Sequence, residues 1–475
     1  MTAPRALRRT RTQESGAALI VVLVLTVIIA GASGAFIWFM NQQQTRAGAR
    51  LRSAAALGAA EAGVHRALSI LESAGPDGTS PGRAWRPAGY PEAVMVGPLQ
   101  GRYTLSIADA PGGAVVITST GDVGGILRRL RVRVYLASPA LLAALHGASF
   151  VRIEQPPAAT FILPYGAGLG DRPWIHIAAG REIWFATTDV SINNPDAPLA
   201  GAPGPADAPV GPNSATAVGR PGPVRLLIAR GAEVTLGATH ERVDLDHLRA
   251  VGVYVEGVVL RTEALPPLPQ IDRDYYRSLA AANAANALIN EAAGKYVGDA
   301  DLALKRDSLY SSAEFERLQA YFTSGLTPPR LRGVIYVSGG IVLLEGRRLE
   351  IADGALVTEG TVRLGEGASL DVTHTAATRT LPGVIVLESG ALLVSGEARL
   401  RAHGLVYASR VIDIREGARA DIVGAVLGND AGLSFRNTGG TVVIRYDPAV
   451  LGTPGLRVAD QDPVVAWIAA WEELP

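Results

Sequence analysis

Residues 15–40 have the sequence SGAALIVVLVLTVIIAGASGAFIWFM, and no charged side chain occurs from Ala17 to Met40. As a helix with a rise of about 1.5 Å per residue, this run is about 36 Å long, enough to cross a hydrocarbon core of about 30 Å. A cleavable secretory signal has a shorter apolar core, of roughly 7–15 residues, although the small residues at 30–35 leave that alternative open. The run predicts a transmembrane helix.

Arginines flank this apolar run, at positions 5, 8, 9 and 11 before it and at positions 46, 50 and 52 after it. Because basic residues are retained on the cytoplasmic side of a membrane, the excess before the run favours a cytoplasmic N-terminus. The bulk of the chain is then expected outside the cytoplasm.

The helical composition continues beyond the apolar run, through Asn41 to about Ser73, and no proline occurs before Pro76. A single helix of about 60 residues is predicted. Its second half has an apolar stripe at three- and four-residue spacing, interrupted by one acid: Ala54, Leu57, Glu61, Val64, Leu68 and Leu71. Such a stripe predicts that this half packs on a globular head.

Composition limits the remaining possibilities for the chain of 475 residues. The 54 glycines and 30 prolines, with only 6% aromatic residues, favour a turn-rich β architecture. The 44 basic residues balance the 44 acidic ones, so the overall charge does not indicate a nucleic-acid partner. The absence of cysteine excludes disulfides, a thiolate nucleophile and cysteine-based metal sites.

The residues after the helix predict a small β domain within 74–138. Residues 74–98 have the glycine and proline content of a linker. Alternating apolar residues at 103–107, 115–120 and 127–136 then predict three strands of an antiparallel sheet on which the helix docks. The arginines that alternate with apolar residues along the third strand indicate a solvated strand face.

Short apolar runs led by glycine recur in the C-terminal part, at Gly333, Gly354, Gly383, Gly404 and Gly424. Their spacings of 21, 29, 21 and 20 residues are typical of the coils of a β-solenoid, with residues 373–380 of the longest interval as a loop. We therefore predict a solenoid over 330–446, a less regular one over 139–262, a helical insertion beside it over 263–329, and a C-terminal cap over 447–475. The expected fold class is mainly β with one long N-terminal α-helix, a β-solenoid-like C-terminal domain and a helical insertion.

Few residues form a pattern that indicates catalysis or metal binding. The closest approach to a catalytic acid pair, as polysaccharide cleavage would need, is a short cluster: Glu241, Asp244, Asp246 and His247. Alternation explains this cluster equally well as an exposed strand. A second set has calcium-ligand residue types but lacks the calcium-hand spacing, which favours a turn: Asp189, Asn193, Asn194 and Asp196. No catalytic residue, cofactor or metal site is predicted, and we expect the protein not to be an enzyme.

The segment SGAALIVVL at 15–23, with AAEAGV at 59–64 and Ala67-Leu68 after it, resembles the N-terminus of PilX-type proteins. These are minor pilin components of type IV pilus assembly, related in plan to the atypical minor pseudopilin of type II secretion. The resemblance covers about residues 8–73. It implies that residues 1–16 are a basic leader, which prepilin peptidase removes after Gly16, so that the mature chain begins at Ala17.

The resemblance also implies an assembly role for the start of the mature helix, residues Leu19, Ile20, Val21, Val22 and Leu23. Most major pilins carry glutamate at the fifth mature position, where this chain has Val21. That departure favours a tip, initiator or accessory role over that of a bulk filament subunit.

The expected function is that of a structural minor pilin-like subunit of a type IV pilus or related secretion filament. It would be anchored in the bacterial inner membrane, with other pilins and prepilin peptidase as partners and a surface ligand or tip adhesin as a further one. Two alternatives stay open: a single-pass anchor unrelated to pili, and a membrane-tethered β-helix that acts as an adhesin or a carbohydrate-active enzyme.

Overall fold

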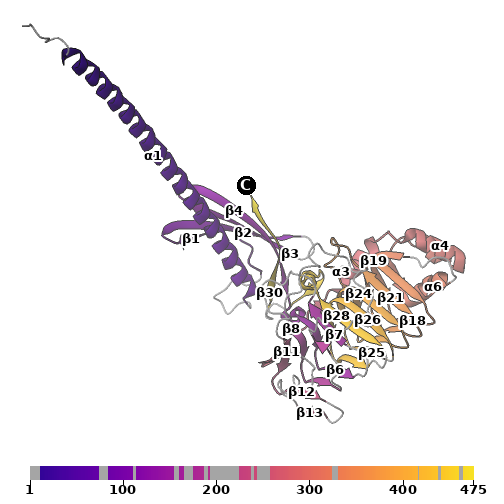
Figure 1. Ribbon diagram of the computed structural model, residues 1–475. Coiled ribbons are helices and arrows are strands. Elements are labelled where there is room, and N and C mark those ends of the chain that lie inside the picture. Colours follow the sequence, from indigo (N-terminus) through magenta and orange to yellow (C-terminus); the bar gives the residue numbers. More distant parts are fainter. Residues whose placement is uncertain are drawn as a thin grey trace, which may run out of the picture.

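The computed structural model describes residues 11–73, 84–110, 114–154, 160–164, 175–186, 191–192, 224–236, 240–242, 257–323, 330–415, 417–436, 440–458 and 464–474. Within these residues, one long N-terminal helix leads into a small sheet, here called the head sheet, and then into a larger domain of parallel strands (Figure 1). Mainly β structure with a single long N-terminal helix is what the sequence predicted.

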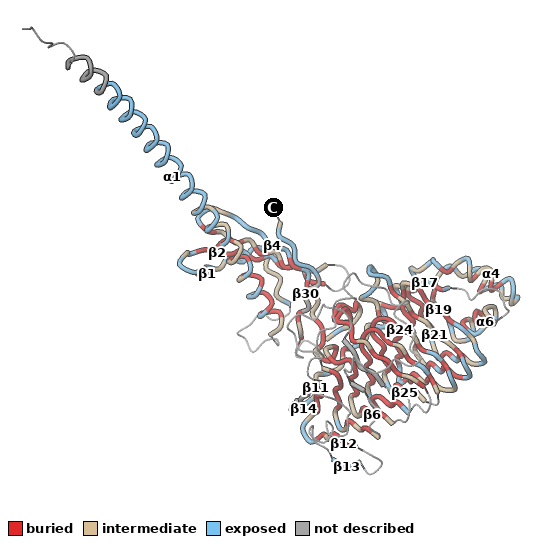
Figure 2. Tube along the Cα trace, viewed as in Figure 1, coloured by how far each residue is buried: buried red, intermediate tan, exposed pale blue. Residues whose placement is uncertain are grey.

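Helix α1 (Arg11–Glu72) contains 62 residues without a break. Its first part stands clear of the rest of the protein and is exposed on all sides, whereas its last five turns are largely buried (Figure 2). Exposure of so many neighbouring apolar side chains to water is unfavourable. The first part of the helix is therefore suited to other surroundings than the part that packs on the protein.

The head sheet has the strand order β1-β2-β3-β4-β30, and every pairing in it is antiparallel. Its strands are β1 (Ala88–Val96), β2 (Leu99–Ala110), β3 (Ala114–Val123), β4 (Ile126–Ala137) and β30 (Val465–Leu474). The three predicted strands correspond to β2, β3 and β4. Strand β1 lies within the range that was predicted as a linker.

Strand β30 comes from the end of the chain, in the range predicted to be a solenoid cap. It pairs with β4 over its whole length instead of covering an end of the parallel sheets. Arg128 of β4 pairs with Glu473 at 3.1 Å and Arg131 with Glu472 at 3.8 Å. The arginine-rich face of β4 is thus exposed, as predicted, and two of its arginines contact acids of the neighbouring strand.

Two sheets of parallel strands, with one antiparallel pairing at an edge of the second, face each other in the larger domain and share one hydrophobic core. The first contains β5 (Ala143–Gly147), β7 (Thr160–Pro164), β8 (Ile175–Ala179), β10 (Ser191–Ile192), β11 (Val224–Ala229), β14 (Gly257–Thr262), β16 (Leu309–Ser311), β17 (Arg330–Ser338), β19 (Arg348–Thr358), β21 (Ser369–Thr373), β22 (Val384–Val386), β24 (Arg399–Ala408), β26 (Arg419–Gly428) and β28 (Thr441–Tyr446). The second contains β6 (Phe150–Glu154), β9 (Glu182–Phe185), β12 (Glu233–Leu236), β13 (Glu241–Arg242), β18 (Ile341–Leu343), β20 (Val362–Leu364), β23 (Leu392–Val394), β25 (Val411–Arg415) and β27 (Gly432–Arg436).

Pairing registers from β17 to β26 follow the predicted spacing. Val334 pairs with Ala355, and Gly404 pairs with Gly424, so a residue stacks on one about 20 positions later. A continuous row of buried apolar side chains results, made of Ile335, Leu356, Val384, Val406, Val426, Leu145, Ile177 and Leu226. Such stacking buries each residue between its counterparts in the two neighbouring coils.

Glycines that lead the apolar runs lie where consecutive coils approach most closely. A Cβ atom on Gly424 would collide with the carbonyl oxygen of Gly404, and both residues have positive φ, +152° and +87°. An L side chain rarely adopts these angles, so glycine is required there for two independent reasons.

The order of the strands in space differs from their order in the chain. The first half of the domain begins with β5 in the middle of the sheet and extends outward to β14. The second half begins at the opposite end, with β16 and β17, and returns to the middle, where β26 pairs with β5. Both connections to the head sheet therefore leave from the middle of the parallel domain.

The helical insertion lies across the end of the parallel sheets rather than beside them (Figure 1). It contains α3 (Arg273–Ala282), α4 (Ala287–Val297), α5 (Ala300–Leu304) and α6 (Ser312–Thr323), with α3 against β17 and α6 against β18. The two remaining strands, β15 (Gln270–Ile271) and β29 (Leu456–Arg457), pair with each other nearby. Short 3-10 helices, Pro139–Leu142 and Pro448–Gly452, occupy the junction with the head sheet.

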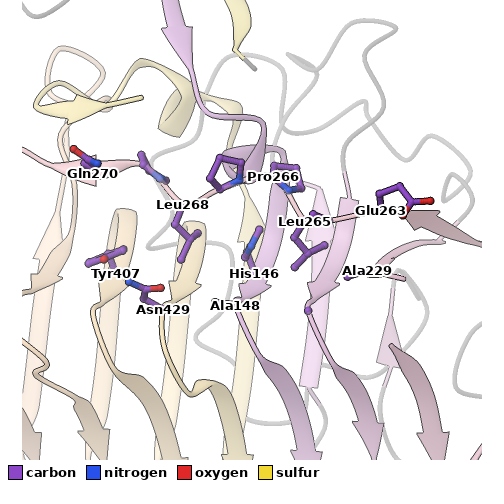
Figure 3. A pocket seen from close by; sticks show the side chains of 14 residues that line it. His146, Ala148, Ala229, Glu263, Leu265, Pro266, Leu268, Gln270, Tyr407 and Asn429 are labelled. Carbon is purple, nitrogen blue, oxygen red and sulfur yellow. The ribbon is translucent and has the colours of Figure 1, made fainter. Parts of the chain in front are cut away.

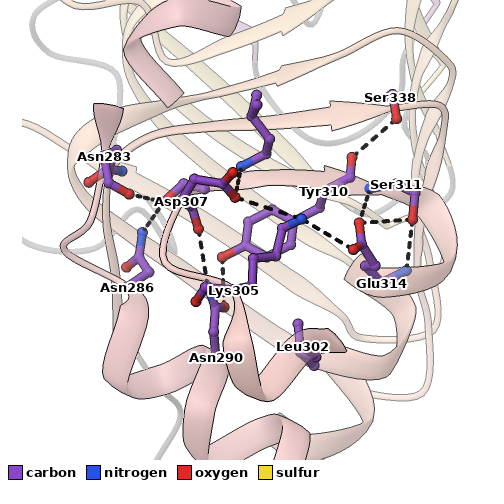
Figure 4. A network of polar contacts seen from close by, with 12 residues as sticks. Asn283, Asn286, Asn290, Leu302, Lys305, Asp307, Tyr310, Ser311, Glu314 and Ser338 are labelled. Carbon is purple, nitrogen blue, oxygen red and sulfur yellow. Dashed lines mark hydrogen bonds and ion pairs between the residues drawn. The ribbon is translucent and has the colours of Figure 1, made fainter. Parts of the chain in front are cut away.

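Asparagine side chains complete this end of the sheet (Figure 4). The buried Asn286 accepts a hydrogen bond from the backbone nitrogen of Arg332 at 2.9 Å and donates one to the carbonyl oxygen of the same residue at 2.9 Å. Asn283 donates to the carbonyl oxygens of Arg332 and Val334. Because an open strand edge is a template for aggregation, these amides protect β17 where no further strand pairs with it.

Candidate functional site

The predicted membrane and assembly residues lie on the free part of α1. Leu19, Ile20, Val21, Val22 and Leu23 are 60–71% exposed, and α1 is long and apolar enough to cross a membrane. The hydroxyl of Thr26 in this part donates to the Val22 carbonyl oxygen at 2.7 Å. Since that bond satisfies the hydroxyl within the helix, the whole stretch suits an apolar environment.

Small residues interrupt the apolar surface of the helix at Gly31, Ala32, Ser33 and Gly34. A Cβ atom at Gly31 or Gly34 would meet no atom within 4 Å, so this part of the helix has no partner within the described chain. Small side chains let another helix approach closely in a membrane. The helix therefore offers both an apolar surface long enough to cross a membrane and a position that another helix can approach closely.

The second part of α1 lies against β2, β3 and β4 at very short range. A Cβ atom on Gly121 of β3 would lie 2.6 Å from the backbone nitrogen of Ala60 and closer still to the Ala56 carbonyl oxygen. On the helix, a Cβ atom on Gly63 would lie 2.9 Å from the ring of Tyr103. Small residues on both sides thus set the distance between helix and sheet.

The predicted apolar stripe agrees with this contact only in part. Val64, Leu68 and Leu71 are buried as expected, whereas Ala54 and Glu61 are exposed. The contact is made instead by a broader face of small residues, namely Ala55, Ala56, Ala59, Ala60, Gly63 and Ala67. The AAEAG element, quoted above for its family resemblance, therefore has a direct packing role.

Polar contacts fix the position of α1 on the head sheet at both ends of the contact. Glu72 accepts a hydrogen bond from the backbone nitrogen of Ala466 in β30 at 2.8 Å. Near the point where the helix leaves the sheet, Arg128 Nε donates to Ser53 Oγ at 2.9 Å. The chain's last strand and the last turn of α1 therefore hold each other in place, which sequence patterns alone did not indicate.

The predicted processing residues, Gly16 and Ala17, fall within the bounds of α1, but their side-chain environment lies outside the described residues. The possible acid pair, Asp244 and Asp246, also lies outside them, as do His247 and the four residues of the possible calcium loop. Glu241 is exposed at the start of β13. In the described part of the chain, no group of three or more His, Asp or Glu side chains is placed to hold a metal ion.

Sequence reasoning missed one cluster on the outer face of β6, β9 and β12. The ring of His240 stacks on Trp184 with centroids 4.1 Å apart, and Arg152 lies over the ring of Phe150. Glu182 accepts hydrogen bonds from Thr235 and from the His240 ring, and these two bonds lower the pKa of its carboxyl group against the opposing effect of burial. The polar groups and rings of this cluster contact one another. We therefore interpret the cluster as a cover on the sheet surface.

No protein-family model matches the chain. No curated protein matches it either. Among solved structures, the chain is similar to the crystal structure of the competence-associated pilin ComZ from Thermus thermophilus, with 15% identity over 89% of this chain and 97% of that chain, at a TM-score of 0.26. A TM-score this low does not assign a fold to the chain. The fold described above rests on the strand registers of this chain alone.

Proposed function

We propose that the protein is a minor pilin-like structural subunit of a type IV pilus or a related secretion filament. Helix α1 anchors it in the bacterial inner membrane with a cytoplasmic N-terminus and later packs among the helices of other pilins. The two parallel sheets form a β-solenoid, which the head sheet carries at the tip or on the surface of the filament. The role is structural rather than catalytic.

One observation carries this proposal: a single unbroken helix has two different surfaces. Its first part is apolar and exposed on every side, and its second part is buried on an antiparallel sheet through small residues. An ordinary membrane anchor needs no rigid continuation into its external domain. A subunit that must leave the membrane and pack into a filament does, because the apolar part then exchanges lipid for neighbouring helices.

N-terminal sequencing of the full-length protein, expressed with and without prepilin peptidase, tests the proposal. We expect a mature chain that begins at Ala17 only when the peptidase is present, and no cleavage of a Gly16→Leu variant. An intact Met1 end in the presence of the peptidase, or a cut near residue 35, would contradict the pilin pathway. A Gly31→Leu variant serves as the matched control, because it changes the same helix away from the junction and should be cleaved normally.

A second candidate function is a membrane-tethered adhesin. It is favoured by a cavity that residues 263–270 cover on the parallel domain. The two candidates are compatible, because a filament subunit can also display a binding site.

A further inference from the structure

A cavity of about 540 Å³ lies between the parallel domain and the segment Glu263–Gln270, here called the strap. The strap runs along one corner of the domain, over the ends of strands from several coils (Figure 3). Side chains of His146, Tyr407 and Asn429 line the cavity on the side of the parallel sheets. They come from residues far apart in the chain, which the pairing of β26 with β5 brings together.

The strap is held at several points. Leu265 packs on a small apolar cluster with Ala143 and Leu227, and Leu268 packs on the main core of the domain. The carbonyl oxygen of Pro267 accepts a hydrogen bond from Ser138 Oγ at 2.7 Å. Since both leucines are anchored, the prolines between them stay at a fixed distance from the coils, and the space below them is part of the fold.

Prolines at 266, 267 and 269 give the strap a particular hydrogen-bonding character. Proline has no backbone N–H, so this part of the strap offers carbonyl acceptors and few donors. An extended peptide lying against it would find few donors for its own carbonyl groups. A ligand with hydroxyl groups can donate to the strap, because each hydroxyl is both a donor and an acceptor.

On the opposite wall, His146 has an unused hydrogen-bonding atom. The side chain is only 2% exposed, and its Nδ1 atom has no hydrogen-bond partner among the described residues. Burial lowers the pKa of the imidazole to about 4, while a hydrogen bond with the backbone of Ala140 opposes that change. A neutral ring with a free nitrogen suits a hydroxyl partner, because an unpaired buried polar atom is costly.

The charge of the lining narrows the ligand class further. Among the lining residues that the structure describes, only Glu263 has a formal charge, and it pairs with Arg230 at 3.1 Å. No lysine or arginine is among the described residues of the lining, so none of these residues would compensate the charge of an anionic polymer. The tyrosine ring, the amides of Asn429 and Gln270, and the apolar strap are groups that bind neutral, hydroxyl-rich rings.

We propose that this cavity is a binding site for a neutral carbohydrate, formed by His146, Tyr407 and Asn429 on one wall and by the strap on the other. The site displays a glycan-recognition surface on the parallel domain. It does not depend on filament assembly, since all of its residues belong to that domain and the strap.

Calorimetric titration of the full-length protein, in micelles of a detergent without a sugar headgroup, tests this proposal. The probes are maltotetraose, cellotetraose and N-acetylchitotetraose, with heparin as a polyanion. We expect saturable binding of at least one tetrasaccharide and no binding of heparin. The His146→Phe and Asn429→Leu variants should each weaken the binding tenfold or more, whereas His65→Phe, on the exposed side of α1, should bind as the wild type does.

Failure of all three tetrasaccharides to bind would overturn the proposal, as would stronger binding of heparin. Binding that neither cavity variant weakens would place the sugar elsewhere on the protein and overturn it equally. If His146→Phe does not fold, Tyr407→Phe replaces it, because this change removes a single hydroxyl group and leaves the ring in place. A Tyr407→Phe variant with unchanged affinity, together with an unchanged Asn429→Leu variant, would again reject the site.

Discussion

Gly121 shows how a single residue determines the contact between α1 and the head sheet. Its missing side chain lets the backbone of α1 at Ala56 and Ala60 lie directly on β3. We predict that Gly121→Ala lowers the stability of the head by about 1–3 kcal/mol, as overpacking of a dense core does, because the added methyl group collides with backbone atoms. Thermal unfolding of the full chain in micelles measures the change.

Gly48→Ala is the matched control for this substitution. Gly48 lies on the same helix, and a Cβ atom there would meet nothing within 4 Å. Alanine should therefore leave the head intact and favour the helix by up to about 1 kcal/mol. Equal stability of Gly121→Ala and the wild type would show that the helix can move away from the sheet, contrary to the close packing described here.

For single residues of the helix, the sequence predicted which large apolar side chains are buried, but not which small residues form the contact with the sheet. Val64, Leu68 and Leu71 follow an ordinary apolar spacing, so their burial could be predicted. The contribution of Ala56 and Ala60 could not, because alanine is common on exposed and buried helix faces alike. Only the glycine facing them on another element, more than 50 residues away in the chain, turns these alanines into a contact surface.

Among the elements, the C-terminal strand β30 completes the head sheet. We predict that truncation after Pro463 exposes the edge of β4, removes the Ala466 amide that donates to Glu72, and loosens the end of α1 from the sheet. Hydrogen exchange should then become faster for the backbone amides of β4, and the parallel domain should keep its protection. If the same segment capped the parallel sheets, the protection would be lost there and kept in β4.

A double substitution of Glu472 and Glu473 by glutamine is the control for this truncation. It removes two surface ion pairs with β4 but leaves the strand in place, and exposed pairs contribute only about 0–1 kcal/mol each. Exchange in β4 should therefore stay close to that of the wild type.

Elements with a regular pattern could be predicted from the sequence, and those without one could not. The glycine-led runs predicted coils about 20 residues apart, because each coil repeats the same requirement for a close approach. Strand β1 was included in a linker because of the glycines and prolines at 75–87 that precede it, and its own Pro91 is tolerated in an edge strand. Strand β30 was assigned to a cap because an apolar end does not reveal which sheet it joins.

For the whole molecule, the order of the coils decides how the domains are connected. Strand β26 pairs with β5, and Ser149 donates to the carbonyl oxygen of Asp430, 281 residues away, at 2.6 Å. No local pattern in the sequence encodes such a contact, so the sequence predicted the spacing of the paired strands without their order in space. The chain enters and leaves the parallel domain near the middle of its larger sheet. Two adjacent connections, one from the side of α1 and one to β30, therefore join this domain to the head sheet.

The two domains also differ in their buried histidines, which predicts different responses to acid. Burial lowers the pKa of His146 and of His403 to about 4, and it lowers the pKa of His374 as well; all three belong to the parallel domain. Around His403, the charges of His374 and Arg401 lower the pKa further, whereas Asp421 and a hydrogen bond with the backbone of His374 oppose them. A folded-state pKa below the unfolded value means that the native state binds fewer protons. The resulting stability is complete above about pH 6.5 and is lost as the pH falls toward 4.

We predict that acid destabilises the parallel domain before the head, by about 3 kcal/mol at pH 4 for each of His146 and His403. Thermal unfolding between pH 7 and pH 4, with hydrogen exchange to separate the domains, measures this effect. His403→Asn should reduce the loss of stability over this range, because asparagine cannot take up the proton, while the exposed His65→Asn should change nothing. Equal pH dependence of His403→Asn and the wild type would mean that His403 is already solvated in the native state. The acid sensitivity of the domain would then have to come from His146 and His374 or from its carboxylates.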